Sequence, residues 1–207
     1  MVDLLEKEEG KLAVKIARKT IEHNLTTGEV IDRSDFEVTS IFYEQRGVFV
    51  TLNKEGALRG CIGRPYPDME LIDAIIDSAI SAAAKDPRFP PVQKKEMDDI
   101  AVEITVMTKP ELIDREPGSI PELISIGKHG LIIKKGCHQG LLLPQVASDH
   151  QLNEIEFLGH TCLKAGLSPN EWKTGNVQIY RFEGQIFKEE VPRGNIIEES
   201  LDDSSCR

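Results

Sequence analysis

The chain has 207 residues and a net charge of −10, because 35 aspartates and glutamates outnumber 25 lysines and arginines. Its 40% apolar and 29% charged residues are typical of a soluble globular protein. An acidic chain lacks the basic face that phosphate contacts require, so we expect neither nucleic acid nor a membrane as its partner. The sequence starts without a leader pattern and has no apolar run near the about 18 residues of a membrane span. We therefore expect a cytoplasmic protein.

The first half of the chain predicts two helices and three strands. The 3.6-residue and two-residue spacings of apolar side chains separate the two kinds of element. In order, they are a helix over 4–24, strands over 47–53 and 57–62 joined by the turn Lys54-Glu55-Gly56, a helix over 69–85 and a strand over 100–107. The proline-rich loop Asp86–Pro91 follows the second helix and ends it.

The second half predicts two more hairpins with a helix between them. The expected elements are strands over 130–134 and 140–143, a helix over 147–165 that ends at Gly166, and strands over 176–182 and 184–188 that turn at Glu183-Gly184. Hairpins separated by helices indicate an α+β protein with a mainly antiparallel sheet and flanking helices. The expected organisation is one domain over 1–190, with one or two lobes, and an acidic, disordered tail over 191–207.

Leu58–Gly63, with the sequence Leu-Arg-Gly-Cys-Ile-Gly, is the most informative stretch. Its glycines allow the backbone to turn and another group to approach closely. Arg59 lies two positions before Cys61, on the same face of a strand, where a guanidinium favours the thiolate or binds a carboxylate. Alternatively, Arg59 is exposed to solvent or forms a structural salt bridge. The start of the following helix favours an anion as well, because its first N–H groups are unpaired. The alternative is that Cys61 is a small buried residue at a strand end.

Glu103 is a second candidate, as an acid–base group. Strand alternation places Ala101, Glu103 and Thr105 on one face, and Val102, Ile104 and Val106 on the other. If both faces of the sheet are covered, Glu103 is partly buried and its pKa rises, which suits acid–base catalysis. If one face is open to water, it is an ordinary exposed glutamate.

Three further residues complete a predicted cleft. His129, in Gly-Lys-His-Gly, is either a base for Cys61 or a surface or capping residue of its turn. Arg88 either binds substrate or forms an ion pair with Asp86 that fixes the proline loop. Gln145 follows the Leu-Leu-Leu-Pro run and is assigned to substrate binding with Arg59 and Arg88.

The four cysteines, at positions 61, 137, 162 and 206, indicate reduced thiols. No pair of them has the CxxC spacing of a zinc knuckle or a redox dithiol. Cys137 and His138 alone are too few ligands for a metal, and no glycine-rich phosphate loop is present. The sequence therefore predicts neither a metal nor another cofactor.

Seven motifs taken together resemble the AMME-syndrome chromosomal-region candidate protein family. In chain order they are Gly-Val-Phe-Val-Thr-Leu, Leu-Arg-Gly-Cys-Ile-Gly, Asp-Pro-Arg-Phe-Pro-Pro, Val-Glu-Ile-Thr-Val-Met-Thr, Gly-Lys-His-Gly-Leu-Ile-Ile, Gly-Leu-Leu-Leu-Pro-Gln-Val-Ala and Lys-Ala-Gly-Leu, within residues 10–190. The resemblance implies an α+β fold of two unequal lobes around an antiparallel sheet, and it brings no established reaction. The family usually has an acidic residue and a tryptophan where this chain has Ser148–Asn153.

Two hypotheses about function follow. The first is a cysteine-dependent enzyme that acts on a small polar or acyl-type substrate in a cleft around Leu58–Gly63. The second is a non-catalytic adaptor whose motif loops form a surface for a protein partner. An enzyme requires an ionised, accessible Cys61 with a base in reach, whereas an adaptor requires only an exposed patch. The oligomeric state is left open.

Overall fold

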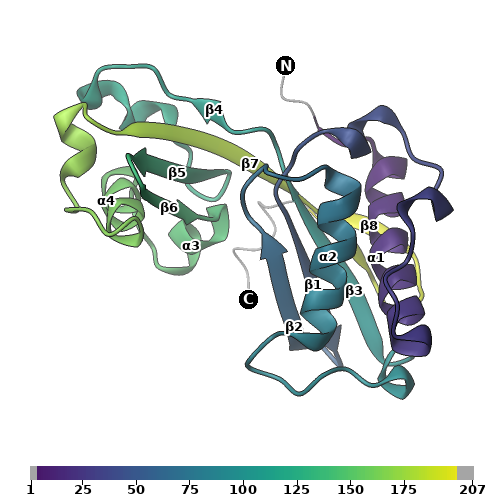
Figure 1. Cartoon of the computed structure of the whole chain (residues 1–207). Coiled ribbons are helices and arrows are strands. Elements are labelled where there is room, and N and C mark those ends of the chain that lie inside the picture. Colours follow the sequence, from purple (N-terminus) through teal and green to yellow (C-terminus); the bar gives the residue numbers. More distant parts are fainter. Residues whose placement is uncertain (1–3, 200–207) are drawn as a thin grey trace. The chain divides into compact units, whose positions relative to one another are not determined.

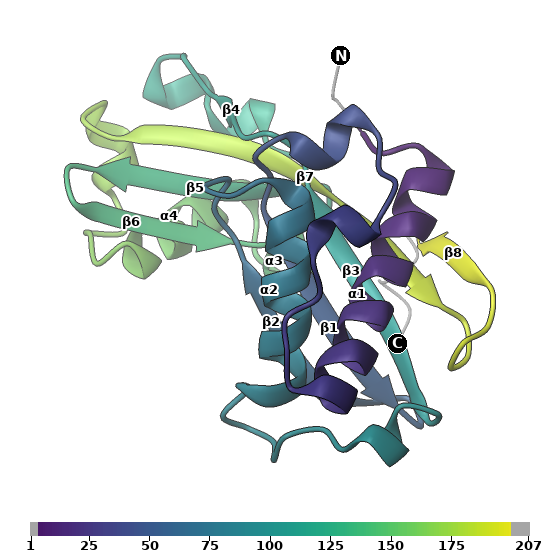
Figure 2. The same ribbon diagram turned by 45° about the vertical axis from the view of Figure 1, so that its right-hand side comes forward.

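The computed structural model describes residues 4–199, and it has an α+β fold in which neighbouring strands run antiparallel (Figures 1 and 2). This confirms the expected fold class. The chain divides into two compact units. The first contains residues up to Lys109 together with Gln185–Glu199, and the second contains Pro110–Gly184. The strand β7 (Gln178–Glu189) supplies residues to both units.

The first unit contains two α-helices and a sheet. Its elements are α1 (Lys7–Thr27), β1 (Val48–Lys54), β2 (Ala57–Arg64), α2 (Leu71–Ala84), β3 (Ile100–Met107), the end of β7 and β8 (Ile196–Glu199), with 3₁₀ turns at Arg33–Asp35, Ser40–Tyr43 and Lys94–Glu96. β1 pairs with β2 on one side and with β3 on the other. The expected hairpin over 47–62 is therefore present.

One face of this sheet holds the core of the first unit. Val50, Leu52 and Ile104 are fully buried there with residues of α1 and α2. Both helices pack on the same face, as Figures 1 and 2 show. Because strand side chains alternate, the residues between these apolar positions lie on the face away from the helices. That second face includes Thr51 and Glu103.

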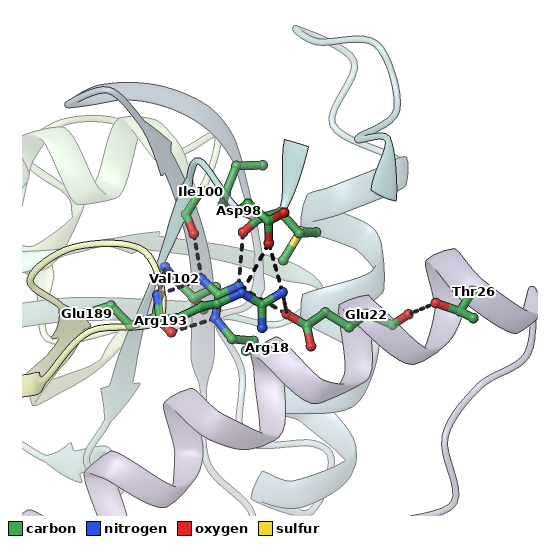
Figure 3. Close-up of polar contacts among 9 residues, drawn as sticks. Arg18, Glu22, Thr26, Asp98, Ile100, Val102, Glu189 and Arg193 are labelled. Carbon is green, nitrogen blue, oxygen red and sulfur yellow. Dashed lines mark hydrogen bonds and ion pairs between the residues drawn. The ribbon is translucent and has the colours of Figure 1, made fainter. Parts of the chain in front are cut away.

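A buried ion pair joins α1 to the strands (Figure 3). The Arg18 guanidinium donates hydrogen bonds from Nε and Nη2 to the Glu189 carboxylate, at 2.6 and 2.5 Å. Arg18 also donates to the carbonyls of Met97 and Ile100, and Glu189 accepts the N–H of Val102. The side chains of Arg18 and Glu189 are 10% and 4% exposed. The pair satisfies backbone groups that would otherwise be buried without partners.

The second unit packs helices on a smaller antiparallel sheet. Its elements are β4 (Glu111–Leu112), β5 (His129–Lys135), β6 (His138–Leu142), α3 (Pro144–Asp149), α4 (Glu154–Lys164) and the start of β7, with 3₁₀ turns at Pro117–Ser119, Pro121–Leu123 and Glu171–Thr174. β5 pairs with both β6 and β7. The core lies between this sheet and α4, and includes Phe157, Leu158 and Trp172.

Three expected elements differ from the structure. The single helix expected over 147–165 is two helices, because the backbone leaves the helical region at Gln151 (φ +51°) and Asn153 caps α4. No turn occurs at Glu183-Gly184, since β7 is one continuous strand there. The expected tail also differs: Ile196–Glu199 pairs with β7 as β8, and residues 200–207 lie outside the described part of the chain.

Candidate functional site

Cys61, Thr51 and Glu103 lie side by side on three neighbouring strands of the first unit. Thr51 is the register partner of Cys61 on one side and of Glu103 on the other. All three side chains are half-buried and lie on the face away from α1 and α2. The Thr51 hydroxyl donates a hydrogen bond to Cys61 Sγ at 3.4 Å. This row brings together a thiol, a hydroxyl and a carboxyl group.

The loop after α2 holds the backbone of Cys61. Asp86 Oδ2 accepts the Cys61 N–H at 2.8 Å, and Arg88 Nη2 donates to the Cys61 carbonyl oxygen at 3.2 Å. The guanidinium also donates to both oxygens of Asp86, at 2.9 and 2.7 Å. β2 is the last strand on its side of the sheet, so its outward backbone groups lack a strand partner. The Asp86–Arg88 pair takes the place of that partner at Cys61.

Asp86 is a buried anion that depends on Arg88. Its side chain is only 2% exposed, and its hydrogen bonds from Arg88 hold the pKa of the carboxyl well below its usual range. Those hydrogen bonds also raise the pKa of Arg88, and the neighbouring Cys61 side chain raises it further. The guanidinium next to the Cys61 thiol is thus that of Arg88.

Arg59 forms a structural salt bridge with Glu96, which was the alternative to a contact with the thiol. A register irregularity between β1 and β2 leaves Arg59 without a partner residue on β1. Its Nε and Nη2 donate to Glu96 at 3.2 and 3.0 Å, and its Nη1 donates to the Pro90 carbonyl at 2.9 Å. Hydrogen bonds from Arg59 lower the pKa of Glu96 to about 2. The guanidinium of Arg59 fixes the loop and the 3₁₀ turn beside β2.

The expected closeness of Cys61 to the start of the next helix is wrong. Gly60, the residue before it, packs on the last turn of α2, where an added Cβ would lie 2.4 Å from the Ala82 carbonyl oxygen. Only glycine fits this approach. The C-terminal end of a helix carries partial negative charge and does not favour a thiolate. The side chains that contact Cys61 by hydrogen bonds are those of Thr51, Asp86 and Arg88.

Glu103 is a half-buried carboxyl group with a raised pKa. Burial raises the pKa of this carboxyl, and the nearby carboxylate of Glu199 raises it further, while the Lys188 ammonium opposes both. Lys188 and Glu199 form an ion pair with each other. A carboxyl group with a raised pKa holds its proton closer to neutral pH than an exposed one does.

His129 and Gln145 belong to the second unit. His129 Nδ1 accepts the N–H of Ser125 at 2.9 Å, which closes the turn before β5, and its Nε2 lies 3.8 Å from Glu183. Burial lowers the pKa of this buried histidine, and Arg181 lowers it further. Gln145 Oε1 is buried without a hydrogen-bond partner in the described chain. Their assignment as base and substrate ligand stays a prediction.

Two further features were sought in the described residues, a metal site and a membrane-spanning helix. Across residues 4–199, no cluster of three or more histidine, cysteine, aspartate or glutamate side chains has the arrangement of a metal site. Over the same residues, no helix is both long enough and apolar enough to cross a membrane.

Sequence reasoning missed the role of Thr51 and the contact of Asp86 with Cys61. The signal for Thr51 was present: it lies between the core positions Val50 and Leu52, and hairpin counting from the turn places it near Cys61. Asp86 is 25 residues from Cys61, and its contact depends on where α2 ends. No local pattern shows that contact.

The fold and the site define a class: an α+β protein that presents a half-buried cysteine on an antiparallel sheet, beside an arginine–aspartate pair. Comparison with known proteins names the family. The profile of the AMMECR1 family matches residues 14–187. The chain therefore belongs to the AMMECR1 family, which agrees with the resemblance found in its motifs.

Similar proteins occur in several archaea. A protein from Methanosarcina acetivorans is 56% identical over 200 residues, which is 96% of this chain and 100% of that protein. Protein MJ0810 from Methanocaldococcus jannaschii is 51% identical over 201 residues, covering 96% of this chain and 98% of its own. The crystal structure of the uncharacterized protein PH0010 from Pyrococcus horikoshii has a TM-score of 0.80 at 45% identity. It covers 94% of this chain and 98% of that one.

Proposed function

We propose that Cys61 is the nucleophile of an enzyme that transfers or hydrolyses the acyl group of a small polar substrate. The observation that carries this proposal is the row Cys61–Thr51–Glu103 across β2, β1 and β3. A nucleophile, a hydrogen-bond donor to its sulfur and a carboxyl group with raised pKa are the groups that acyl transfer needs.

The spacing of the row supports a substrate between its two ends. Neighbouring strands lie about 4.8 Å apart, so the backbones at Cys61 and Glu103 are about 10 Å from each other. Both side chains lie on the same face, over Thr51. In the proposed binding mode, a small acyl compound lies over Thr51 with its carbonyl carbon at Sγ and its leaving group near Glu103.

The proposed hydrolysis needs only the substrate and water as reactants. The Cys61 thiol loses its proton to solvent, and the thiolate Sγ attacks the carbonyl carbon. A sulfur–carbon bond forms while the bond to the leaving group breaks, and the Glu103 carboxyl group gives its proton to the leaving group. Water then hydrolyses the thioester: the water gives one proton back to Glu103, the sulfur–carbon bond breaks, and a carboxylic acid and the Cys61 thiolate are released. The Thr51 hydroxyl stabilises the anionic sulfur by donating to it.

A specific observation also supports the adaptor hypothesis. In the loop Asp86–Pro91, four side chains are exposed: Pro87, Arg88, Pro90 and Pro91. A proline-rich loop loses little conformational entropy when it binds, so it suits a partner surface. This second function needs no reactivity at Cys61, which separates it from the first.

The test is site-resolved alkylation with iodoacetamide across pH, read by mass spectrometry. We expect Cys61 to react faster at neutral pH than Cys137, which lies exposed in a turn, and far faster than Cys162. Cys162 is buried, and burial raises the pKa of its thiol. Thr51→Val is expected to slow labelling of Cys61, because it removes the hydrogen bond that the Thr51 hydroxyl donates to Sγ.

The alkylation test has one control variant and one outcome that would contradict the proposal. Thr105→Val removes a hydroxyl on the same face of the sheet, but Thr105 pairs with Phe49 and not with Thr51, so this variant is expected to leave the labelling rate of Cys61 unchanged. If Cys137 is labelled and Cys61 is not, at every pH at which the protein stays folded, Cys61 is not a nucleophile. The loop-based adaptor function would then be the better account.

A further inference from the structure

The two arginines beside β2 differ in how many of their donors are free. Arg59 uses Nε, Nη1 and Nη2 for Glu96 and Pro90, and its side chain is 13% exposed. Arg88 uses Nε and Nη2 for Asp86 and for the Cys61 carbonyl, and its side chain is 53% exposed. Within residues 4–199, Arg88 Nη1 has no hydrogen-bond partner. The free donor edge therefore belongs to Arg88.

The free edge of Arg88 is held in a fixed position. Asp86 binds one side of the guanidinium with two hydrogen bonds, and the Phe89 ring lies 5.5 Å below it. A guanidinium fixed in this way loses little rotamer entropy when its remaining N–H groups bind a ligand. Planar anions such as carboxylates are the ligands that match these donors.

We propose that Arg88 binds a carboxylate of the substrate next to Cys61, so that the substrate is an acyl compound that carries an acidic group. This inference rests on the proposed function and names its substrate class. Arg88 lies on the outer side of β2, whereas Thr51 and Glu103 lie on the inner side. The carboxylate then occupies the edge of the sheet, the reacting carbonyl lies at Sγ, and the leaving group points to Glu103.

Asp86 sets the selectivity of this site. The Asp86–Arg88 pair is neutral as a whole, so it attracts anions weakly at long range. Recognition depends on the hydrogen bonds of Nη1 at short range. We therefore expect selection for carboxylates of a particular geometry, and weak binding of chloride or other spherical anions.

The experiment compares two alkylating agents that differ only in charge. Iodoacetate carries a carboxylate and iodoacetamide a neutral amide, and both form a sulfur–carbon bond with loss of iodide. The ratio of their rates at one cysteine cancels the fraction of thiolate at that cysteine. We expect this ratio to be about tenfold higher at Cys61 than at the exposed Cys137, the effect of a charge-assisted hydrogen bond of about 1.4 kcal/mol.

Matched variants assign the effect. Arg88→Gln is expected to reduce the ratio at Cys61 to that of Cys137. Arg64→Gln, which changes an arginine of β2 that pairs with Asp77 of α2, is expected to leave the ratio unchanged. A second measurement needs no variant: propionate should protect Cys61 of the native protein from iodoacetamide, whereas propionamide or sodium chloride at equal ionic strength should not.

The outcomes separate the two proposals. If Cys61 reacts rapidly with iodoacetamide but shows the ratio of Cys137 and no protection by propionate, the carboxylate site is overturned and the nucleophile stands. If a raised ratio persists in Arg88→Gln, the assignment to Arg88 is overturned. If Cys61 reacts with neither reagent, the proposed function fails and this inference fails with it.

Discussion

The first unit contains two arginine–carboxylate pairs that make the same kind of contacts but differ in their exposure to solvent. In both places an arginine and a carboxylate form a two-bond pair and also bind the backbone of a strand: Arg18 and Glu189 bind β3, and Arg88 and Asp86 bind β2. The Arg18 side chain is 10% exposed, whereas that of Arg88 is 53% exposed. Every nitrogen of the buried arginine has a partner, and one nitrogen of the exposed arginine has none within residues 4–199.

The difference shows how a structural contact becomes available for function. A fully enclosed pair contributes to stability and to register, because removal of either partner leaves a buried charge. An open pair fixes the backbone with one side and leaves the other side for a ligand. We therefore expect changes at the buried pair to lower the stability of the unit most, and changes at the open pair to act locally on Cys61.

The largest expected effect is at the buried pair. Arg18→Met leaves Glu189 buried and unpaired and removes donors from two carbonyl groups, so the free energy of unfolding should fall by about 3–5 kcal/mol. Urea denaturation measures this loss. Arg18→Met combined with Glu189→Leu should recover part of it, because no unpaired charge remains. Equal losses in the single and double variants would show that charge burial is not the cause.

An intermediate effect is expected at the Cys61 amide. Asp86→Ala removes the acceptor of the Cys61 N–H, so hydrogen exchange at this amide should accelerate about tenfold, for a hydrogen bond to a charged acceptor of about 1.5 kcal/mol. The Val102 amide, which donates to Glu189, is the matched reference. Exchange measured by NMR should change at Cys61 and stay constant at Val102. An equal acceleration at both amides would mean general destabilisation of the unit.

A smaller effect, with a defined sign, concerns Glu103. Its pKa is raised in the folded protein above the ordinary 4.5, so the folded state binds more protons than the unfolded state just above that pH. The contribution of Glu103 to the free energy of unfolding is fully present below pH 4.5 and is lost as the pH rises from 4.5 through the raised pKa of the folded state. Glu103→Gln removes the loss, so its melting temperature relative to wild type should increase as pH rises above 4.5. A constant difference between pH 4 and 8 would contradict the raised pKa.

Local patterns predicted the elements and failed where tertiary pairing decides. The alternation of β1 and β3 identified both faces of the sheet, and with them the position of Glu103. Glu183-Gly184 has the composition of a turn, yet β7 continues through it because its two halves pair with different strands, β5 and β8. β8 itself contains only Ile196–Glu199, which is too short for a periodic signal.

The candidate site was predicted in part. Cys61 and Arg88 were named from their motifs, and they are in contact. Residues two apart on a strand share a face, which would place Arg59 beside the thiol, but the register irregularity breaks that relation. Arg59 forms the structural salt bridge that was its alternative role. The clamp by Asp86 depends on the length of α2 and on the close approach of Gly60 to its last turn, and neither follows from spacing in the sequence.

The most direct test of the nucleophile at Cys61 is the trapping of an acyl-enzyme with p-nitrophenyl acetate, a small activated ester. The account predicts continuous release of nitrophenol and an acetyl group on Cys61 in peptides from quenched protein. Cys61→Ser should abolish both, Glu103→Gln should slow turnover, and Cys137→Ser should leave both unchanged. Nitrophenol release that is equal in wild type and Cys61→Ser, with acetyl groups only on lysines or on Cys137, would contradict the account.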